Sequence, residues 1–257
     1  MRKQILSFLF ALAVTVGVSA SAFGQFLTLG NVGGSSGGGG GGSLTFLWTD
    51  SDFVAGTPAP SVTFTAKSIG TASSDRYVVV TLGWRGSNAA GMDIPTNGVT
   101  IGGVTATRAA YDRSASNAQG VWFAAVPTGT TANIVIGGWT NGFIDAICLN
   151  VGTIKGNASL TNPSNVTTPA YPNGSTATAV TVPSNGVSVI ASVTANNNVG
   201  SPTTSWTGGA ALDKDQTDGP VSFGATGSMS HLTASGTITM SSTNSGGAWG
   251  WVAANFQ

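Results

Sequence analysis

The chain has 257 residues, of which only 7% are charged, and its nine basic and nine acidic side chains balance. No basic stripe is present, so nucleic acid is not expected as a partner. All nine acidic residues are aspartates, and the abundance of Gly, Thr, Ser, Asn and Val disfavours helices and favours short strands joined by turns.

Residues 1–24 have the three parts of a secretory signal peptide. Arg2 and Lys3 open the chain, an apolar run extends from Ile5 to Val18, and small residues follow. The run has about 14 residues, fewer than the roughly 20 that cross a bilayer. We therefore expect an exported protein, secreted or held at a cell or virion surface, with no membrane span after processing. An uncleaved signal anchor is the alternative.

Residues 25–43 comprise a short apolar segment and a Gly/Ser-rich tract that contains six consecutive glycines. Such a tract is a flexible coil. A short apolar segment, a flexible tether and a folded domain, in this order, suggest that the domain is presented away from an attachment point. The alternative is a leader without any role.

From Leu44 onward, apolar and polar residues alternate in short runs, as in strands that bury one face. Turn signals such as Pro95-Thr96-Asn97-Gly98 separate the runs. We predict one all-β domain over residues 44–257, an antiparallel β-sandwich. The expected strands are 61–66, 76–84, 98–106, 120–126, 132–137, 146–151, 177–182, 186–194, 221–225, 236–240 and 248–256.

The strand pattern of residues 58–151 resembles that of residues 172–257. For example, Arg76–Val80 corresponds to Gly186–Ile190. We interpret this as two internally similar halves, with chance similarity between Gly-rich strands as the alternative. Because each half alone would bury little apolar area, we expect one sandwich built from both halves. The Asn/Pro-rich stretch 156–174 is then the crossover between them.

The segments Val99–Thr107 (VTIGGVTAT) and Trp122–Gly129 (WFAAVPTG) carry a resemblance to a known kind of domain. They resemble jelly-roll-like β-sandwich modules of tailed-phage structural proteins and of exported bacterial surface proteins. The likeness extends over residues 58 to 257. It implies a fold and a virion or surface setting, and no reaction. A signal peptide departs from what is usual for a virion component.

The residues needed for catalysis are scarce. His231 is the one histidine, and the adjacent Ser230 is expected on the opposite face of a strand. Cys148 is the one cysteine and is expected to be a buried strand residue. A glycosidase would have to use two aspartates, because glutamate is absent. We therefore predict no enzymatic activity, with a secreted polysaccharide-acting enzyme as a remaining alternative.

The densest acidic cluster is formed by Asp213, Asp215 and Asp218. Three carboxylates and nearby carbonyls could bind calcium, which prefers six to eight oxygen ligands. The alternative is a solvated turn with internal hydrogen bonds. No other cofactor is expected.

Trp249 and Trp251 lie two residues apart, so they share one face of the last expected strand. The opposite face, with Val252, Ala254 and Phe256, is an acceptable core face. If that face is buried, the two indoles form an exposed platform suited to the apolar face of a sugar. The alternative is that both tryptophans are buried.

These features predict a non-enzymatic surface or particle-associated module for recognition, adhesion or assembly, with a glycan, cell-surface or virion partner. A phage fibre, decoration or tail component is the alternative. Strand edges with few charges also favour self-association into a homo-oligomer. Asn157, Asn165 and Asn173 are glycosylation acceptors if the source modifies exported chains.

Overall fold

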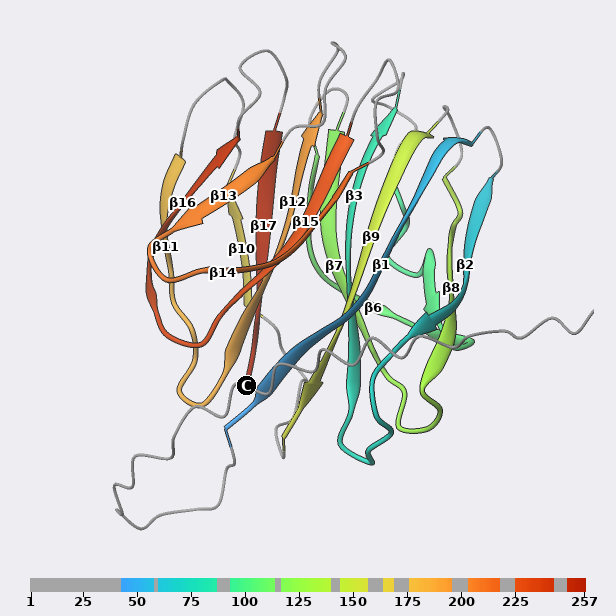
Figure 1. The fold of residues 1–257 in the computed structure, drawn as a ribbon, viewed down its shortest axis with the longest axis horizontal. Coiled ribbons are helices and arrows are strands. Elements are labelled where there is room, and N and C mark those ends of the chain that lie inside the picture. Colours follow the sequence, from blue (N-terminus) through green and yellow to red (C-terminus); the bar gives the residue numbers. More distant parts are fainter. Residues whose placement is uncertain are drawn as a thin grey trace, which may run out of the picture. The chain divides into compact units, whose positions relative to one another are not determined.

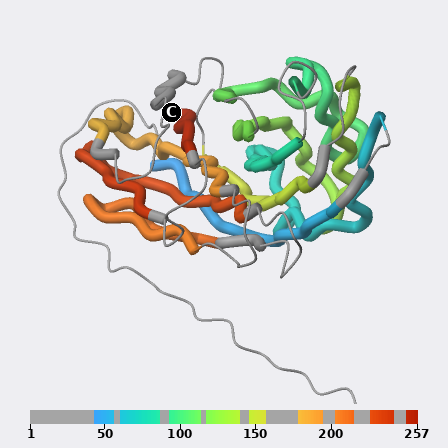
Figure 2. Tube along the Cα trace, turned by 90° about the horizontal axis from the view of Figure 1, so that it is seen from above, coloured from blue at the N-terminus to red at the C-terminus, as the bar shows by residue number. Residues whose placement is uncertain are grey.

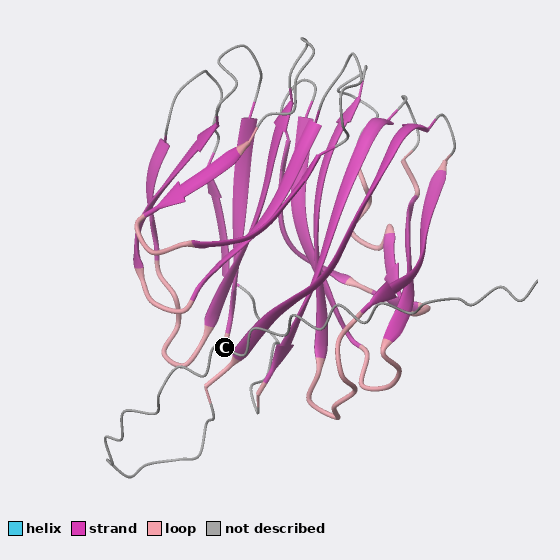
Figure 3. Ribbon diagram, in the orientation of Figure 1, coloured by secondary structure: helices cyan, strands magenta, loops and turns pink. Residues whose placement is uncertain are grey.

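The computed structural model describes residues 43–57, 60–86, 93–113, 117–139, 144–156, 164–168, 176–195, 203–217, 225–242 and 249–257. These residues form antiparallel strands and no helix, as Figure 3 shows. Consequently, no helix in the described ranges is long and apolar enough to cross a membrane. The expected signal peptide, and the expected tether up to residue 42, lie outside the described residues. The all-β class predicted from composition is confirmed.

The strands, in chain order, are β1 (Thr45–Thr57), β2 (Ser61–Ser68), β3 (Tyr77–Gly86), β4 (Val99–Ile101), β5 (Val104–Thr105), β6 (Thr107–Arg113), β7 (Asn117–Ala125), β8 (Thr131–Gly137), β9 (Ile144–Lys155), β10 (Ser164–Thr168), β11 (Thr176–Val180), β12 (Val187–Ala195), β13 (Thr204–Thr207), β14 (Ala211–Thr217), β15 (Ala225–Leu232), β16 (Gly236–Ser242) and β17 (Trp249–Phe256).

The strands up to β9 form one sandwich of two sheets. The first sheet has the order β1-β9-β3-β7-β6, and the second has the order β2-β8-β4-β5. Their facing sides enclose a core that includes Phe64, Trp84, Trp122 and Ile134, all with at most 2% of their surface exposed. Alternation drives this packing in β2, where Val62 and Phe64 point inward while Ser61 and Thr63 face solvent.

The strands from β10 onward form a second sandwich. Its sheets have the orders β10-β17-β12-β15-β14 and β11-β16-β13. A smaller apolar core between them includes Ile190, Ile238, Met240 and Trp251. No sheet combines strands from the two halves among the described residues. The expectation of one sandwich built from both halves is therefore wrong.

The two sandwiches pack through their five-stranded sheets, which gives four layers of strands (Figures 1 and 2). A third apolar cluster lies between the two central sheets and includes Val79, Phe123, Val189, Met229 and Phe256. This packing buries both faces of β3 and β12. It explains why β3 is nearly all apolar, with Val78, Val79 and Val80 in succession.

The two sandwiches have the same connectivity. With β5 set aside, each half supplies eight strands, and the sheet order first-eighth-third-sixth-fifth recurs, as does second-seventh-fourth. This is a jelly-roll arrangement in which the fifth strand joins the larger sheet. Matching topology supports the idea of two similar halves, but it measures no sequence similarity, so duplication stays a prediction.

The packing between the central sheets is reciprocal. β3 packs on β12 and β15, and its counterpart β12 packs on β3 and β7. Likewise β6 packs on β10, and its counterpart β14 packs on β1. Reciprocal contacts are the signature of a twofold interface between identical subunits. The two jelly rolls of the chain are thus packed face to face, as the subunits of a twofold dimer would be.

Arg76 anchors the loops at one end of the first sandwich. Its guanidinium donates to the carbonyls of Val126 at 2.7 Å, Gly70 at 2.8 Å and Thr128 at 2.6 Å, and to two further carbonyls. The residue is only 1% exposed. Five carbonyl oxygens therefore solvate the buried charge in place of a carboxylate, and burial lowers its pKa.

Candidate functional site

The structure does not give the exposed tryptophan platform. Trp251 has no exposed surface, and its ring lies 5.6 Å from that of Trp206 in an edge-on arrangement. The expectation of an exposed indole is therefore wrong at Trp251. β17 lies between the central sheet of the other sandwich and the sheet of β16, so both of its faces are covered. The side chain of Trp249 lies outside the described residues.

The acidic segment is not a turn. Asp213 and Asp215 belong to β14, which pairs with β15, and Asp218 lies outside the described residues. Sheet pairing outweighs the low strand preference of aspartate here. The described residues contain no group of three or more His, Cys, Asp or Glu side chains suited to a metal. The side chain of Asp215 is likewise not described, so the structure assigns a contact only to Asp213.

Asp213 pairs with the single histidine. The Nδ1 atom of His231 lies 2.9 Å from each carboxylate oxygen of Asp213. A bulge interrupts the β14–β15 register between Leu212 and Lys214, and Asp213 is the inserted residue. A β-bulge turns a side chain away from its regular direction, and this one brings the carboxylate to the imidazole.

The pair lies where the second sandwich meets β1 of the first. The ring of Phe46 is 4.8 Å from the imidazole of His231, and the ammonium of Lys214 lies 5.9 Å from the centre of the Trp48 ring. Burial raises the pKa of the Asp213 carboxyl, and the hydrogen bond and charge of His231 oppose that rise. The arrangement joins two sandwiches through aromatic and charged contacts.

A histidine–aspartate pair is also two thirds of a hydrolase triad, so a nucleophile matters. Ser230 lies on the other face of β15, where its side chain is fully buried. Among the described residues, Asp213 is the hydrogen-bond partner of the imidazole, and no hydroxyl or thiol contacts it. The pair can bind and orient a proton at Nδ1, but the described residues place no hydroxyl or thiol nucleophile against the imidazole.

A second bulge lies at the equivalent place in the first sandwich. The β6–β7 register shifts between Arg108 and Ala110, so Ala109 corresponds to Asp213. Thr107 and Ala211 each lie two residues before the bulged residue. Thr107 pairs with Phe123 and Ala211 pairs with His231, so Phe123 is the counterpart of His231. The first sandwich thus has the apolar residues Ala109 and Phe123 where the second has the ionisable pair Asp213 and His231.

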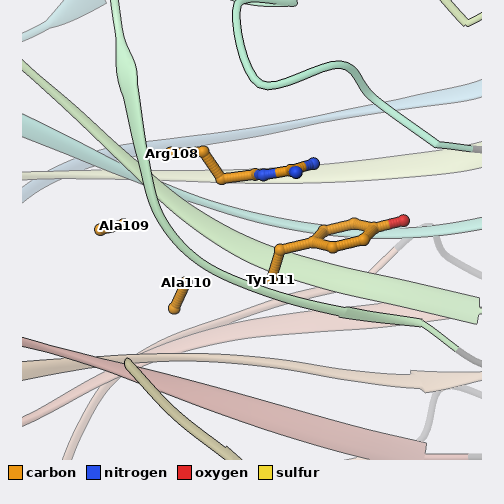
Figure 4. Close-up of a pocket in the computed structure, with 4 residues that line it drawn as sticks. All are labelled: Arg108, Ala109, Ala110 and Tyr111. Atoms are coloured by element: carbon orange, nitrogen blue, oxygen red, sulfur yellow. The ribbon is translucent and has the colours of Figure 1, made fainter. Parts of the chain in front are cut away.

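A pocket of about 190 Å³ lies at this bulge and is lined by Arg108, Ala109, Ala110 and Tyr111 (Figure 4). It is smaller than sites for drug-sized ligands, which measure about 300–1,000 Å³. The guanidinium of Arg108 lies over the ring of Tyr111 at 4.5 Å, as Figure 4 shows. The ring of Trp84 also stacks with the ring of Tyr111, with 5.8 Å between the ring centres and an interplanar angle of 24°.

Two further contacts hold Arg108. Its Nη1 atom donates to the carbonyl of Ile94 at 3.0 Å and lies 3.3 Å from a carboxylate oxygen of Asp93. Burial and the nearby Asp93 charge raise the pKa of Tyr111, which keeps the phenol neutral. In the described part of the chain, Nε and Nη2 of Arg108 have no hydrogen-bond partner. One edge of a fixed guanidinium therefore remains available.

Neither ionic site was identified from the sequence. The sequence predicts Asp213 as a calcium ligand and does not pair it with His231, because that pairing depends on a bulge. Arg108 and Tyr111 belong to no motif, so the sequence alone does not mark them as a site. The one signal that links the two sites is the similarity of the two halves, because β6 and β14 occupy the same position in their sheets.

No protein-family model, no curated protein and no solved structure matches this chain.

Proposed function

We propose that this chain is an exported, non-enzymatic β-sandwich module that recognises a carbohydrate on a surface or particle. The observation that supports this function best is the pocket on β6, where a fixed guanidinium and a neutral phenol line a space of about 190 Å³. Such a space admits one ring-sized group, and a few convergent polar atoms fix its orientation. The sequence adds an export signal and a Gly/Ser tether that would present the head.

The arrangement of ionisable groups supports recognition over catalysis. His231 is occupied by Asp213 and shielded by Phe46. Glycoside hydrolysis requires two carboxyl groups about 5–9.5 Å apart that flank one bond. At the pocket, Asp93 is exposed and paired with Arg108, which suits it to accept hydrogen bonds from sugar hydroxyls.

A glycan array probed with the mature chain, run beside an assay for released reducing ends, tests this function. The proposal predicts retention of a glycan without cleavage. It also predicts that retention survives Asp213→Asn and His231→Gln. Release of reducing ends that disappears in both variants would overturn the proposal in favour of a polysaccharide-acting enzyme.

Assembly through a strand edge is a second function that one observation favours. β11 is an edge strand without a charged residue, and its register with β16 is uninterrupted. Its counterpart β2 has a bulge after Phe64, and Lys67 forms an ion pair with Asp52 at 2.6 Å. Bulges and lysines block edge pairing, so β11 is the less protected edge.

We propose that a second copy of the chain pairs along β11. Ala179 is exposed and uncharged, so Ala179→Lys places a charge on this edge. Light scattering should give a larger mass for the native chain than for the variant at equal concentration. A native chain that remains a monomer over a wide concentration range would overturn this second function.

A further inference from the structure

The unpartnered edge of Arg108 indicates which carbohydrates the pocket would select. The Nη1 side of the guanidinium is occupied by Ile94 and Asp93, whereas Nε and Nη2 donate to no described residue. These two atoms present parallel N–H groups on one edge. A planar group with two acceptor oxygens fits that edge by two hydrogen bonds, and a carboxylate is such a group.

The guanidinium is held in place before any ligand binds. Trp84, Tyr111 and Arg108 form a stack, with 5.8 Å between the two ring centres and 4.5 Å from the phenol ring to the guanidinium carbon. Trp84 is fully buried and also contacts Trp122 at 6.1 Å, so the base of the stack is part of the core. A side chain fixed in this way loses little entropy on binding.

Space and charge limit the rest of the ligand. The pocket volume of about 190 Å³ leaves room for one ring. Arg108 and Tyr111 extend from one side of β6, whereas Ala109 and Ala110 point to the other side, into the cluster between the central sheets (Figure 4). Asp93 lies on the far side of the guanidinium with half of its side chain exposed, so it can accept hydrogen bonds from hydroxyl groups. The same carboxylate would repel a ligand with several negative charges.

We infer that the β6 pocket takes the carboxylate of an acidic sugar, a hexuronic acid residue held by the Nε–Nη2 edge of Arg108. This inference rests on the proposed carbohydrate recognition. It names the ligand class, the group that is recognised and the residue that recognises it. Since the contact is an ion pair at a partly exposed guanidinium, affinity should also fall as salt is added.

Calorimetric titration of the mature chain with the methyl glycosides of glucuronic acid, galacturonic acid, glucose and galactose tests the inference. A uronide should bind at least about tenfold more tightly than its neutral counterpart. Sodium acetate is the arm that separates a sugar from a simple carboxylate. Acetate that binds as tightly as the uronides would overturn the sugar assignment.

Variants assign the contact to Arg108. Arg108→Ala should weaken uronide binding at least about tenfold, and Arg108→Lys should also weaken it, because an ammonium keeps the charge but lacks the fork. Arg113→Ala is the matched control, an exposed arginine on the same strand, and should leave binding unchanged. Thermal unfolding of Arg108→Lys verifies the fold. Uronide binding that both Arg108 variants retain would overturn the inference.

The same experiments distinguish failure of the uronide inference from failure of the proposed carbohydrate recognition. Selective binding of neutral glycans, independent of Arg108, would overturn the carboxylate assignment and leave carbohydrate recognition standing. Failure of every glycan on the array to bind would overturn both.

Discussion

A Cβ atom on Gly227 would lie 2.6 Å from the Cβ atom of Cys148, so the two sandwiches meet there with no room for a side chain. Gly227 belongs to β15 of the second sandwich, and Cys148 belongs to β9 of the first. The same position would also bring a Cβ to 3.5 Å from the Cα atom of Gly83. Contact between carbon atoms is favourable only near 3.5–4.0 Å, so glycine is required for this approach.

Gly227→Ala should therefore destabilise the chain by about 1–3 kcal/mol, the usual effect of overpacking. Chemical denaturation measures the change in the free energy of unfolding. Cys148→Gly removes the opposing Cβ atom, so the double variant should lose less than the sum of the two single changes. Strict additivity of the two substitutions would contradict the contact.

Arg76→Met should lower the free energy of unfolding by about 3 kcal/mol or more. The substitution leaves five carbonyl oxygens without the donors that now satisfy them, and each such loss costs about 1–3 kcal/mol before relaxation. Arg113→Met, at an exposed position of β6, should change stability by no more than about 0.5 kcal/mol. Equal effects of the two substitutions in denaturant would rule out an anchoring role for Arg76.

Gln119 should be replaceable with a gain in stability. Its side chain is fully buried, and within the described residues neither amide atom has a hydrogen-bond partner. Gln119→Met keeps the volume and removes the unpaired groups, so the free energy of unfolding should rise by about 1–3 kcal/mol.

Asn150→Ala is the matched comparison for Gln119→Met. The Nδ2 atom of Asn150 donates to the carbonyl of Gly227 at 3.2 Å, so this substitution should destabilise the chain. Urea denaturation measures the free energy of unfolding of both variants, which should rise in Gln119→Met and fall in Asn150→Ala. A loss of stability in Gln119→Met would show that the glutamine makes a needed contact.

The Asp213–His231 pair predicts a pH dependence. Burial raises the pKa of Asp213 in the folded chain above 3.8. A carboxyl with a raised folded pKa holds its proton more tightly when folded. Its stabilising contribution is thus present below 3.8 and is lost as the pH rises through the raised pKa. Asp213→Asn should remove this part of the dependence, which is worth roughly 1.4 kcal/mol for each pKa unit.

His231→Gln tests the cause of that pKa. The imidazole opposes the effect of burial, so its removal should raise the pKa of Asp213 further and extend the window to higher pH. Carbon-13 titration of the aspartate carboxyls measures the midpoint directly. A lower midpoint in His231→Gln would contradict the assigned pairing.

The β class and most strand positions could be predicted from the sequence, because alternation and turn residues are local signals. The expected strand at residues 132–137 is β8, and the turn at Pro95 is closed by the Gly98 amide at 2.8 Å from its carbonyl. The burial of Cys148 was likewise predicted correctly. Each of these predictions depends only on residues within a single strand or turn.

The arrangement of the sheets could not be predicted in this way. Val79 and Val189 are buried by the opposite sandwich, and nothing in either strand distinguishes that partner from another sheet. The same packing covers Trp251, which the pattern allowed to be exposed. The 44–257 unit was expected as one domain, and residues from Gly40 onward do cluster as one compact unit, but it contains two sandwiches.

The ionic sites depend on single inserted residues. At Asp213 and Ala109 a bulge turns the chain, and a shift of one residue changes the face on which each side chain lies. Propensity and periodicity do not place such an insertion. Trp84, which stacks with Tyr111 beneath Arg108, comes from β3, and β7 separates that strand from β6 in the sheet.

The most direct test of carbohydrate recognition on β6 is a crystal structure of the mature chain with the uronide that binds best. The sugar is expected at the bulge of β6, with its carboxylate oxygens within hydrogen-bond distance of Nε and Nη2 of Arg108. A sugar bound at another surface, with that edge of Arg108 still unoccupied, would contradict it.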